Sequence, residues 1–213
     1  CVTAQESIPI GVTFNSDGSK MYIVGYTNDT VYQYTLGTAW DVSTANFSVT
    51  KTITTNGKAL ASAITFNGVG GAWQLQDALA TTGLGLTLTN GTFDPNVKTV
   101  SMTGAGTAAV SGAFSFYNFT RTGTAVTTDG LTFSANVTVT NTLTLTGNSA
   151  TNKIFVKSSS AGAQRIITAA AVSLSDVKFR DIDADGAVIP WTGTRLIDYG
   201  NNLDITFSAI VYK

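Results

Sequence analysis

The sequence predicts an all-β protein, a parallel β-helix or β-solenoid preceded by a small antiparallel β-sheet. Strong helix formers are scarce: Glu6 is the only glutamate, whereas Thr, Val, Ile and Phe, which suit a pleated strand, are abundant. Charged residues make up only 12% of the chain, against roughly 25% in an average soluble domain, so uncharged polar side chains must cover the surface. Short apolar runs separated by Gly, Asn, Ser and Asp recur along most of the chain.

Residues 1–54 are predicted to form the antiparallel segment. Ile10, Val12 and Phe14 are spaced two apart, residues 15–18 supply a turn, and Met21 begins a return strand. The segment resembles one blade of a repeat found in β-propeller-like arrays of bacterial and phage surface proteins, through the stretch IPIGVTFNSDGSKMYIVGYTNDTVYQYTLGTAWDVSTANFS. A four-stranded capping sheet is the alternative interpretation.

Residues 55–213 are predicted to form the solenoid. Apolar runs begin at Leu131, Val137 and Leu143, six residues apart, and Ile154 and Val172 are eighteen apart. Three faces of six residues would make one coil of eighteen, which stacks its inward residues on the next coil. A β-sandwich is the competing fold, but its strands typically repeat about every 8 to 12 residues. We therefore expect parallel, coil-stacked ladders over at least half of the strand residues between 70 and 207.

Three stretches within about residues 70–207 resemble the β-helical repeats of phage-virion and bacterial surface proteins: GGAWQLQDALATTGLGLTLTNGTFDPN, FSFYNFTRTGT and NKIFVKSSSAGAQRIITAAAVSLSDVKFRDI. The resemblance implies a structural or adhesive component of an extracellular assembly, foremost a phage tail fibre, spike or capsid-decorating protein. A bacterial surface adhesin or extracellular fibre subunit is the alternative. The motifs specify architecture rather than activity.

The composition argues against several function classes. The chain has no histidine, so it lacks the usual base of a Ser-His-Asp triad, and we expect no enzyme. The rival is a polysaccharide-degrading β-helix enzyme, which would need two carboxylates facing one groove. A net charge of −1 without a basic run disfavours nucleic-acid binding. No apolar stretch approaches the roughly 20 residues of a membrane span.

Cys1 is the only cysteine, so an internal disulfide framework is excluded. A mature bacterial lipoprotein also begins with a lipidated cysteine, and a trimmed chain end is the other interpretation of this residue. The C-terminal run ITFSAIVYK has no capping helix. Because solenoid ends expose unpaired backbone groups, we expect homo-oligomerisation or insertion among other virion or surface proteins. The contact is predicted at Ile205, Phe207, Ile210 and Val211.

Acidic residues cluster in one stretch, where Asp181, Asp183, Asp185 and Gly186 spell D-x-D-x-D-G. Calcium loops open in this way, which makes the three carboxylates candidate calcium ligands. The twelfth position, where an EF-hand loop carries a bidentate Glu, is Thr192 here. A solvated turn is the alternative interpretation, because Asp and Gly are ordinary turn residues.

Aromatic rings beside polar side chains can bind sugars, and Trp191, Arg195 and Tyr199 follow one another closely. Trp73 is a further candidate for a glycan site. Aromatic residues of a β-protein are also frequent core residues, so a packing role is the competing interpretation.

Overall fold

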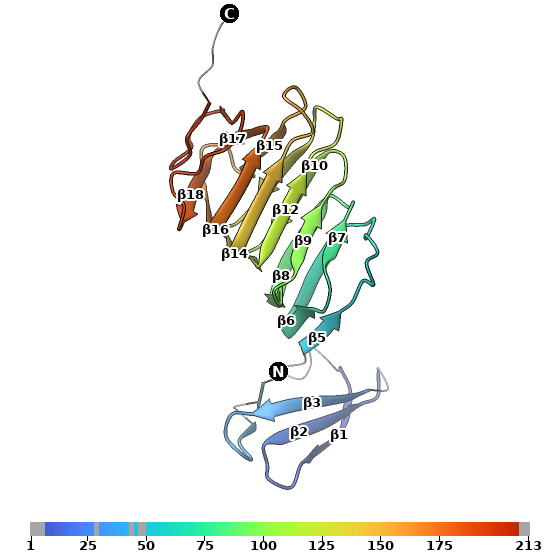
Figure 1. Cartoon of the computed structure of the whole chain (residues 1–213). Coiled ribbons are helices and arrows are strands. Elements are labelled where there is room, and N and C mark those ends of the chain that lie inside the picture. The colour runs from blue at the N-terminus through green and yellow to red at the C-terminus, as the bar shows by residue number, and fades with distance from the viewer. Residues whose placement is uncertain (1–6, 28–29, 43–44, 47–49, 209–213) are drawn as a thin grey trace, which may run out of the picture. The chain divides into compact units, whose positions relative to one another are not determined.

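The computed structural model describes residues 7–27, 30–42, 45–46 and 50–208. It is built of strands and turns with about 1% helix, which confirms the all-β class. The chain divides into two compact units (Figure 1). The first comprises residues 1–51 with the short segments 67–72 and 90–92, and the second comprises the other residues from 52 to 213. Among the described residues, no helix has the length and apolar character of a membrane span.

The first unit contains an antiparallel sheet with the strand order β1-β2-β3-β4. Its strands are β1 (Pro9–Phe14), β2 (Lys20–Gly25), β3 (Val31–Leu36) and the short β4 (Ala45–Asn46). The predicted turn between β1 and β2 is present: the Gly18 amide donates to the Asn15 carbonyl, and the Asn15 side chain accepts from the Lys20 amide at 2.7 Å. The antiparallel N-terminal sheet of the prediction is therefore confirmed.

One face of this sheet is apolar. Met21, Ile23, Tyr34 and Leu36 are buried on it, and alternate residues of β2 and β3 face away. Trp40 closes the hairpin by packing against Phe14, with 5.5 Å between ring centroids. Gly18 must be a glycine here, because an added Cβ would lie 2.3 Å from the Trp40 ring and its φ is +68°.

The second unit is a parallel β-solenoid of about six turns. One sheet has the order β19-β17-β15-β13-β10-β8-β6-β5, and the other has the order β18-β16-β14-β12-β9-β7, with β11 paired to β14. The bounds are β5 (Thr50–Ile53), β6 (Ile64–Leu75), β7 (Leu79–Thr81), β8 (Gly85–Asp94), β9 (Thr99–Met102), β10 (Thr107–Ser111), β11 (Ser115–Phe116), β12 (Asn118–Thr122), β13 (Gly130–Phe133), β14 (Val137–Thr146), β15 (Ile154–Ser158), β16 (Arg165–Ser175), β17 (Val177–Arg180), β18 (Ile182–Gly186) and β19 (Ile197–Asp198).

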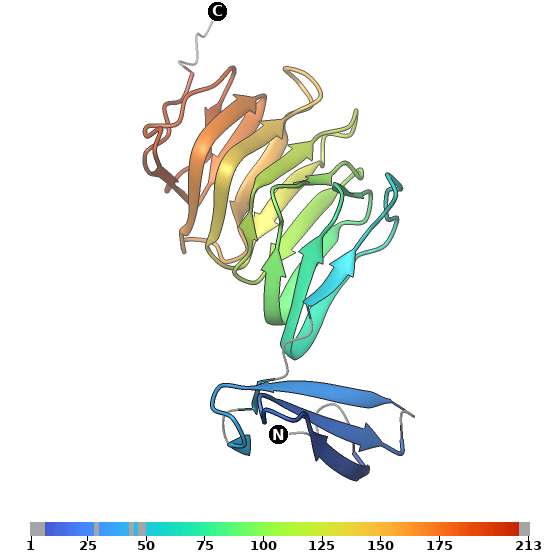
Figure 2. The same ribbon diagram turned by 60° about the horizontal axis from the view of Figure 1, so that its bottom comes forward.

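Figures 1 and 2 show these strands as successive rungs along the unit, from cyan at its first coil to red at its last. From β7 onward, every described pairing between named strands is parallel. The prediction of coil-stacked parallel ladders is confirmed, and the antiparallel β-sandwich is excluded for this unit.

The predicted coil of eighteen residues is wrong. Ladder partners lie 19 positions apart at Thr99 and Asn118, 25 at Leu131 and Val156, and 29 at Leu143 and Val172, so the coils differ in length. The six-residue spacing describes only part of a coil: Val137 and Leu143 lie in one strand, β14, whose register shifts between Val139 and Thr142. A loop from residue 147 to 153 then carries the chain back to the other sheet. This loop adds residues that follow no apolar period.

The interior of the solenoid is filled by inward side chains stacked from coil to coil. Val156 pairs with Leu131 on one side and Phe179 on the other, and all three are fully buried. Phenylalanine rings also stack on one another: the centroids of Phe116 and Phe119 are 4.6 Å apart. Each coil therefore rests on apolar surface of the preceding coil, which provides the main stabilisation.

Phe133→Ala should destabilise the solenoid by about 3 to 5 kcal/mol, because it removes a fully buried ring and leaves a cavity. Urea denaturation followed by circular dichroism measures the loss. Thr132→Ala, at the neighbouring outward position, is the matched control and should change stability by less than about 0.5 kcal/mol. Equal losses in the two variants would contradict the inward placement of Phe133.

Candidate functional site

The predicted site residues other than Trp73 all fall between Asp181 and Tyr199, in the last coils of the solenoid. A buried carboxylate that the sequence did not single out, Asp176, organises this region. It accepts a hydrogen bond from Lys153 Nζ at 2.9 Å, and Arg195 donates to both of its oxygens through Nε and Nη2, each at 2.6 Å. Asp176 is only 3% exposed. Arg195, expected to bind a glycan, is thus bound to this carboxylate.

The surroundings of Asp176 favour its charged form. The Arg195 guanidinium holds the pKa of the Asp176 carboxyl well below its usual range, with Lys153 acting in the same direction against the opposing effect of burial. The backbone of Asp176 has φ +58°, and its carbonyl accepts from the Ile154 amide. This cluster fixes a corner where the chain passes from β16 to β17.

The candidate calcium ligands do not form an EF-hand loop, because the D-x-D-x-D-G motif runs into strand β18. Asp181 is buried and accepts from Asn201 Nδ2 at 2.7 Å, while its other oxygen lies 3.2 Å from Arg180 Nε. The hydrogen bond from Asn201 lowers the pKa of Asp181 most, and Arg180 contributes in the same direction. Asp185 is exposed and accepts from Thr168 Oγ1 at 3.1 Å.

Asp183 differs from its neighbours. Burial raises the pKa of its carboxyl, and the negative charges of Asp204 and Asp185 raise it further. Within the described residues, no three or more His, Cys, Asp or Glu side chains form a group that could hold a metal ion. Asp181 is thus buried at the corner before β18, whereas Asp183 and Asp185 lie at outward positions of that strand.

Of the predicted glycan residues, Trp191 offers no surface. Its side chain is fully buried in the hydrophobic core of the solenoid, and its backbone pairs with that of Ile205. The packing interpretation is correct for this residue. Trp73 is partly buried and packs on Phe66 with a centroid distance of 5.3 Å. Tyr199 is 52% exposed and is the predicted aromatic residue that offers a ring to solvent.

Tyr199 belongs to a group that the sequence did not reveal, which we call the aromatic–basic cluster. Its members are Phe155, Lys157, Lys178, Arg180 and Tyr199. The Phe155 and Tyr199 rings lie 5.2 Å apart between centroids. Lys157 Nζ and Arg180 Cζ lie 5.3 and 5.5 Å from the Phe155 centroid, and Lys178 Nζ lies 5.7 Å from that of Tyr199. Such cation–aromatic contacts hold each charge against a ring.

The predicted C-terminal contact residues lie partly in the chain's own core. Ile205 and Phe207 are partly buried hydrophobic residues packed against the solenoid interior, and the Phe207 ring lies 6.4 Å from that of Phe179. Ile210 and Val211 lie outside the described residues, as does Cys1. Half of the predicted contact is therefore used, at least in part, to cover the last coil.

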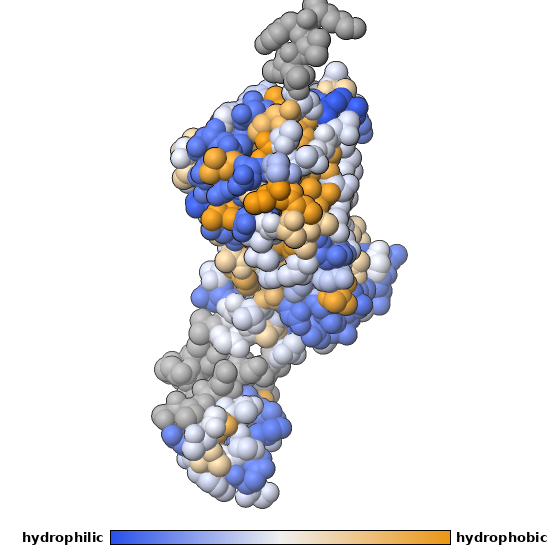
Figure 3. Space-filling view, turned by 60° about the vertical axis from the view of Figure 1, so that its left-hand side comes forward, coloured by the Kyte–Doolittle hydropathy of each residue, from blue (hydrophilic) through white to orange (hydrophobic). Residues whose placement is uncertain are grey.

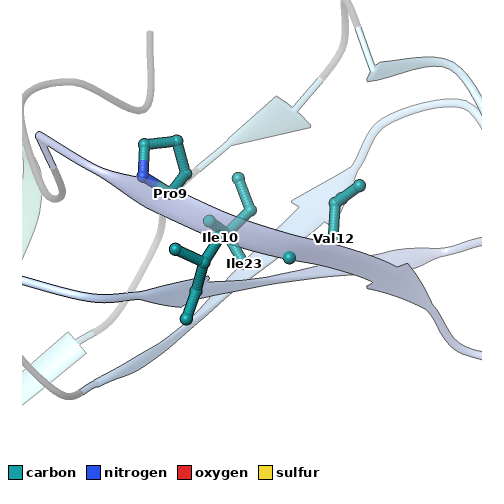
Figure 4. Close-up of a pocket in the computed structure, with 5 residues that line it drawn as sticks. Pro9, Ile10, Val12 and Ile23 are labelled. Carbon is teal, nitrogen blue, oxygen red and sulfur yellow. The ribbon is translucent and has the colours of Figure 1, made fainter.

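An open pocket of about 390 Å³ lies in the first unit, far in sequence from the residues described above. Its walls are Pro9, Ile10, Gly11, Val12 and Ile23, and Figure 4 shows only apolar side chains around it. No group of this lining could transfer a proton or act as a nucleophile.

The surface of the C-terminal coils is mixed. Figure 3 shows apolar and hydrophilic areas side by side on this part of the second unit. Its exposed large apolar residues include Ile166, Val188, Ile189 and Leu203, each between 38% and 52% exposed. Exposed apolar residues are common on the surfaces of folded proteins, so these four do not by themselves define a site.

Comparison with protein families, with curated proteins and with solved structures finds no match to this chain. The class is therefore defined by the fold: a parallel β-solenoid with an N-terminal antiparallel sheet.

Asp176→Asn should lower the free energy of unfolding at pH 7 by about 2 kcal/mol, because it removes a buried charge from hydrogen bonds to two cations. A carboxyl with a depressed folded-state pKa stabilises the fold above its unfolded pKa of about 3.9, and this contribution is lost as the pH falls toward the folded value. The gap between wild type and variant should therefore shrink between about pH 5 and pH 2.5.

Urea denaturation at several pH values measures this gap, and Asp185→Asn, at an exposed carboxyl, is the control. A gap that stays constant with pH, or an equal loss in the control, would contradict the assigned role of Asp176.

Proposed function

We propose that the chain is a structural and adhesive segment of an extracellular assembly, foremost of a phage virion as a tail fibre, spike or capsid decoration. The observation that carries the proposal is the parallel stacking of the second unit, in which strands of successive coils are hydrogen-bonded neighbours in two sheets. A solenoid is nearly one-dimensional, so added coils extend its length without a new core. This architecture suits a spacer that presents a surface away from its attachment point.

The side-chain pattern supports the same role. Most of the buried residues are apolar, and the outward positions of β13 and β10 carry small uncharged residues such as Thr132, Ala109 and Ser111. Such a surface has little charge to repel a neighbouring copy. A bacterial adhesin or extracellular fibre subunit would use these features equally well, so the two assignments differ in host assembly rather than in mechanism.

Immunogold labelling tests the proposal. Antibodies raised against the recombinant chain should label virions, filaments or the cell surface in cultures of the source organism or its phage. Label confined to the cytoplasm in sectioned cells would overturn the extracellular assignment. Pre-immune serum and cultures that lack the gene are the controls.

A polysaccharide-degrading enzyme is the alternative function, and a simple activity assay distinguishes it from the structural proposal. Among the carboxyl groups that the structure describes, that of Asp183, with its raised pKa and the neighbouring Asp204 and Asp185, would suit a general acid. We expect no release of reducing ends from acidic or neutral polysaccharides. Release that Asp183→Asn abolishes, and Asp94→Asn leaves intact, would replace the structural proposal with the enzymatic one.

A further inference from the structure

The outer face of the sheet that contains β15 and β17 changes character along the solenoid. Outward residues occupy two columns whose members are partners in consecutive parallel ladders. The first column is Gly85, Ala109, Thr132, Lys157 and Arg180, and the second is Thr107, Gly130, Phe155, Lys178 and Ile197. The first column becomes basic from β15 onward, at Lys157 and Arg180. The second passes from small residues to Phe155 and Lys178 and then ends at Ile197.

The core does not require this change. Val156 and Phe179 point inward from the same strands and are fully buried, while Phe155, Lys157 and Lys178 alternate with them at half-buried outward positions. Thr132 shows that a small polar residue is accepted in the same column one coil earlier. The large side chains are therefore a local property of the outer surface.

The charges of the cluster are arranged unfavourably for the fold alone. Lys157 and Arg180 are direct partners on adjacent strands, and both charged groups lie against the Phe155 ring, at 5.3 and 5.5 Å from its centroid. Two like charges held at one ring repel each other. Arg180 has the Asp181 carboxylate at 3.2 Å. In the part of the chain that the structure describes, neither Lys157 nor Lys178 forms an ion pair with a carboxylate.

The rings make the cluster more than a basic patch. Phe155 lies against both Lys157 and Arg180, and Tyr199 lies beside Phe155 and Lys178 with half of its surface exposed. Aromatic faces accept the apolar face of a sugar ring, and lysine and arginine donate charged hydrogen bonds to carboxylates or sulfates. Both kinds of contact are available on one face.

We propose that the aromatic–basic cluster binds an acidic polysaccharide, with its sugar rings on Tyr199 and Phe155 and its carboxylate or sulfate groups at Lys157, Lys178 and Arg180. This inference rests on the proposed adhesive function and names the ligand class for it. The small side chains of the preceding coils, at Thr132 and Ala109, leave a flat surface along which an extended chain can lie.

A polysaccharide fits this surface better than a nucleic acid does. Backbone phosphates require a longer series of cations, and the chain as a whole carries a net charge of −1. The cluster supplies three cations on two adjacent strands and then ends. A ligand with spaced charges and apolar sugar faces matches this number and arrangement.

The test uses the full chain with immobilised polygalacturonate, sulfated dextran and neutral dextran in biolayer interferometry. Wild type should bind at least one acidic polymer, more weakly as the salt concentration rises, and should not bind neutral dextran. The double variant Lys157→Gln/Lys178→Gln should bind at least about tenfold more weakly. Tyr199→Ala, which leaves the charge unchanged, should bind roughly fivefold more weakly.

The matched control is Lys58→Gln/Lys98→Gln, which removes the same charge from other parts of the second unit. It should bind like wild type, and circular dichroism melting should show that all variants remain folded. The proposal is overturned if wild type binds no acidic polymer, if the control loses as much affinity as the cluster variant, or if single-stranded DNA or polyglutamate binds as tightly. Immunogold label outside the cell together with no polysaccharide binding would reject this site alone and leave the proposed function intact.

Discussion

The structure depends on keeping successive coils in register. In the parallel ladders, an inward residue must lie over an inward residue of the coil before it, because a slip of one position would turn every apolar side chain to solvent. Leu131, Val156 and Phe179 form one such column, and all are fully buried. The requirement explains why the interior is apolar along its length, while the outward positions between these residues vary freely in size and charge.

The corners of the coils impose a second requirement, because backbone groups that leave the ladders there must still find partners. Arg121 meets it with a fully buried guanidinium that donates to the carbonyls of Met102, Gly106, Thr122 and Gly130. At another corner, the Asp176 carboxylate accepts hydrogen bonds from Lys153 and Arg195. Buried charged residues are often candidates for catalysis. Here, however, Arg121 donates hydrogen bonds to backbone carbonyls, and Asp176 accepts hydrogen bonds from other charged side chains. Their environments therefore explain perturbed pKa values without a reaction.

The proposed binding surface and the apolar core lie on opposite faces of the same strands. Because outward residues contribute little to the core, the surface can acquire a binding group on a few coils while the ladder remains unchanged. The contrast between Thr132 and Lys157, which are partners in one column, illustrates this freedom. A site made in this way is an open face built on rigid strands, which favours adhesion to extended ligands over enclosure of a small one. The pocket of the first unit is lined by residues without polar side chains, so it offers no comparable charged or hydrogen-bonding side chain.

The sequence by itself determined the fold class. Low charge, scarce helix formers and short alternating runs were sufficient for the all-β class, and the residues around Asn15 were sufficient for the N-terminal hairpin. The six-residue spacing favoured the solenoid over a sandwich, although it measures only part of a coil. Strand and turn formation depends on residues that are close in sequence, so the spacing of apolar residues predicts it directly. The coil length was not predictable, because the loops between faces, such as residues 147–153, follow no period. Coil length in turn decides which residues become neighbours. Only the tertiary structure therefore decided that Trp191 is buried beside the segment that contains Ile205. It also brought Phe155, Lys178 and Tyr199 together from different strands or turns, because their contacts depend on the coil lengths.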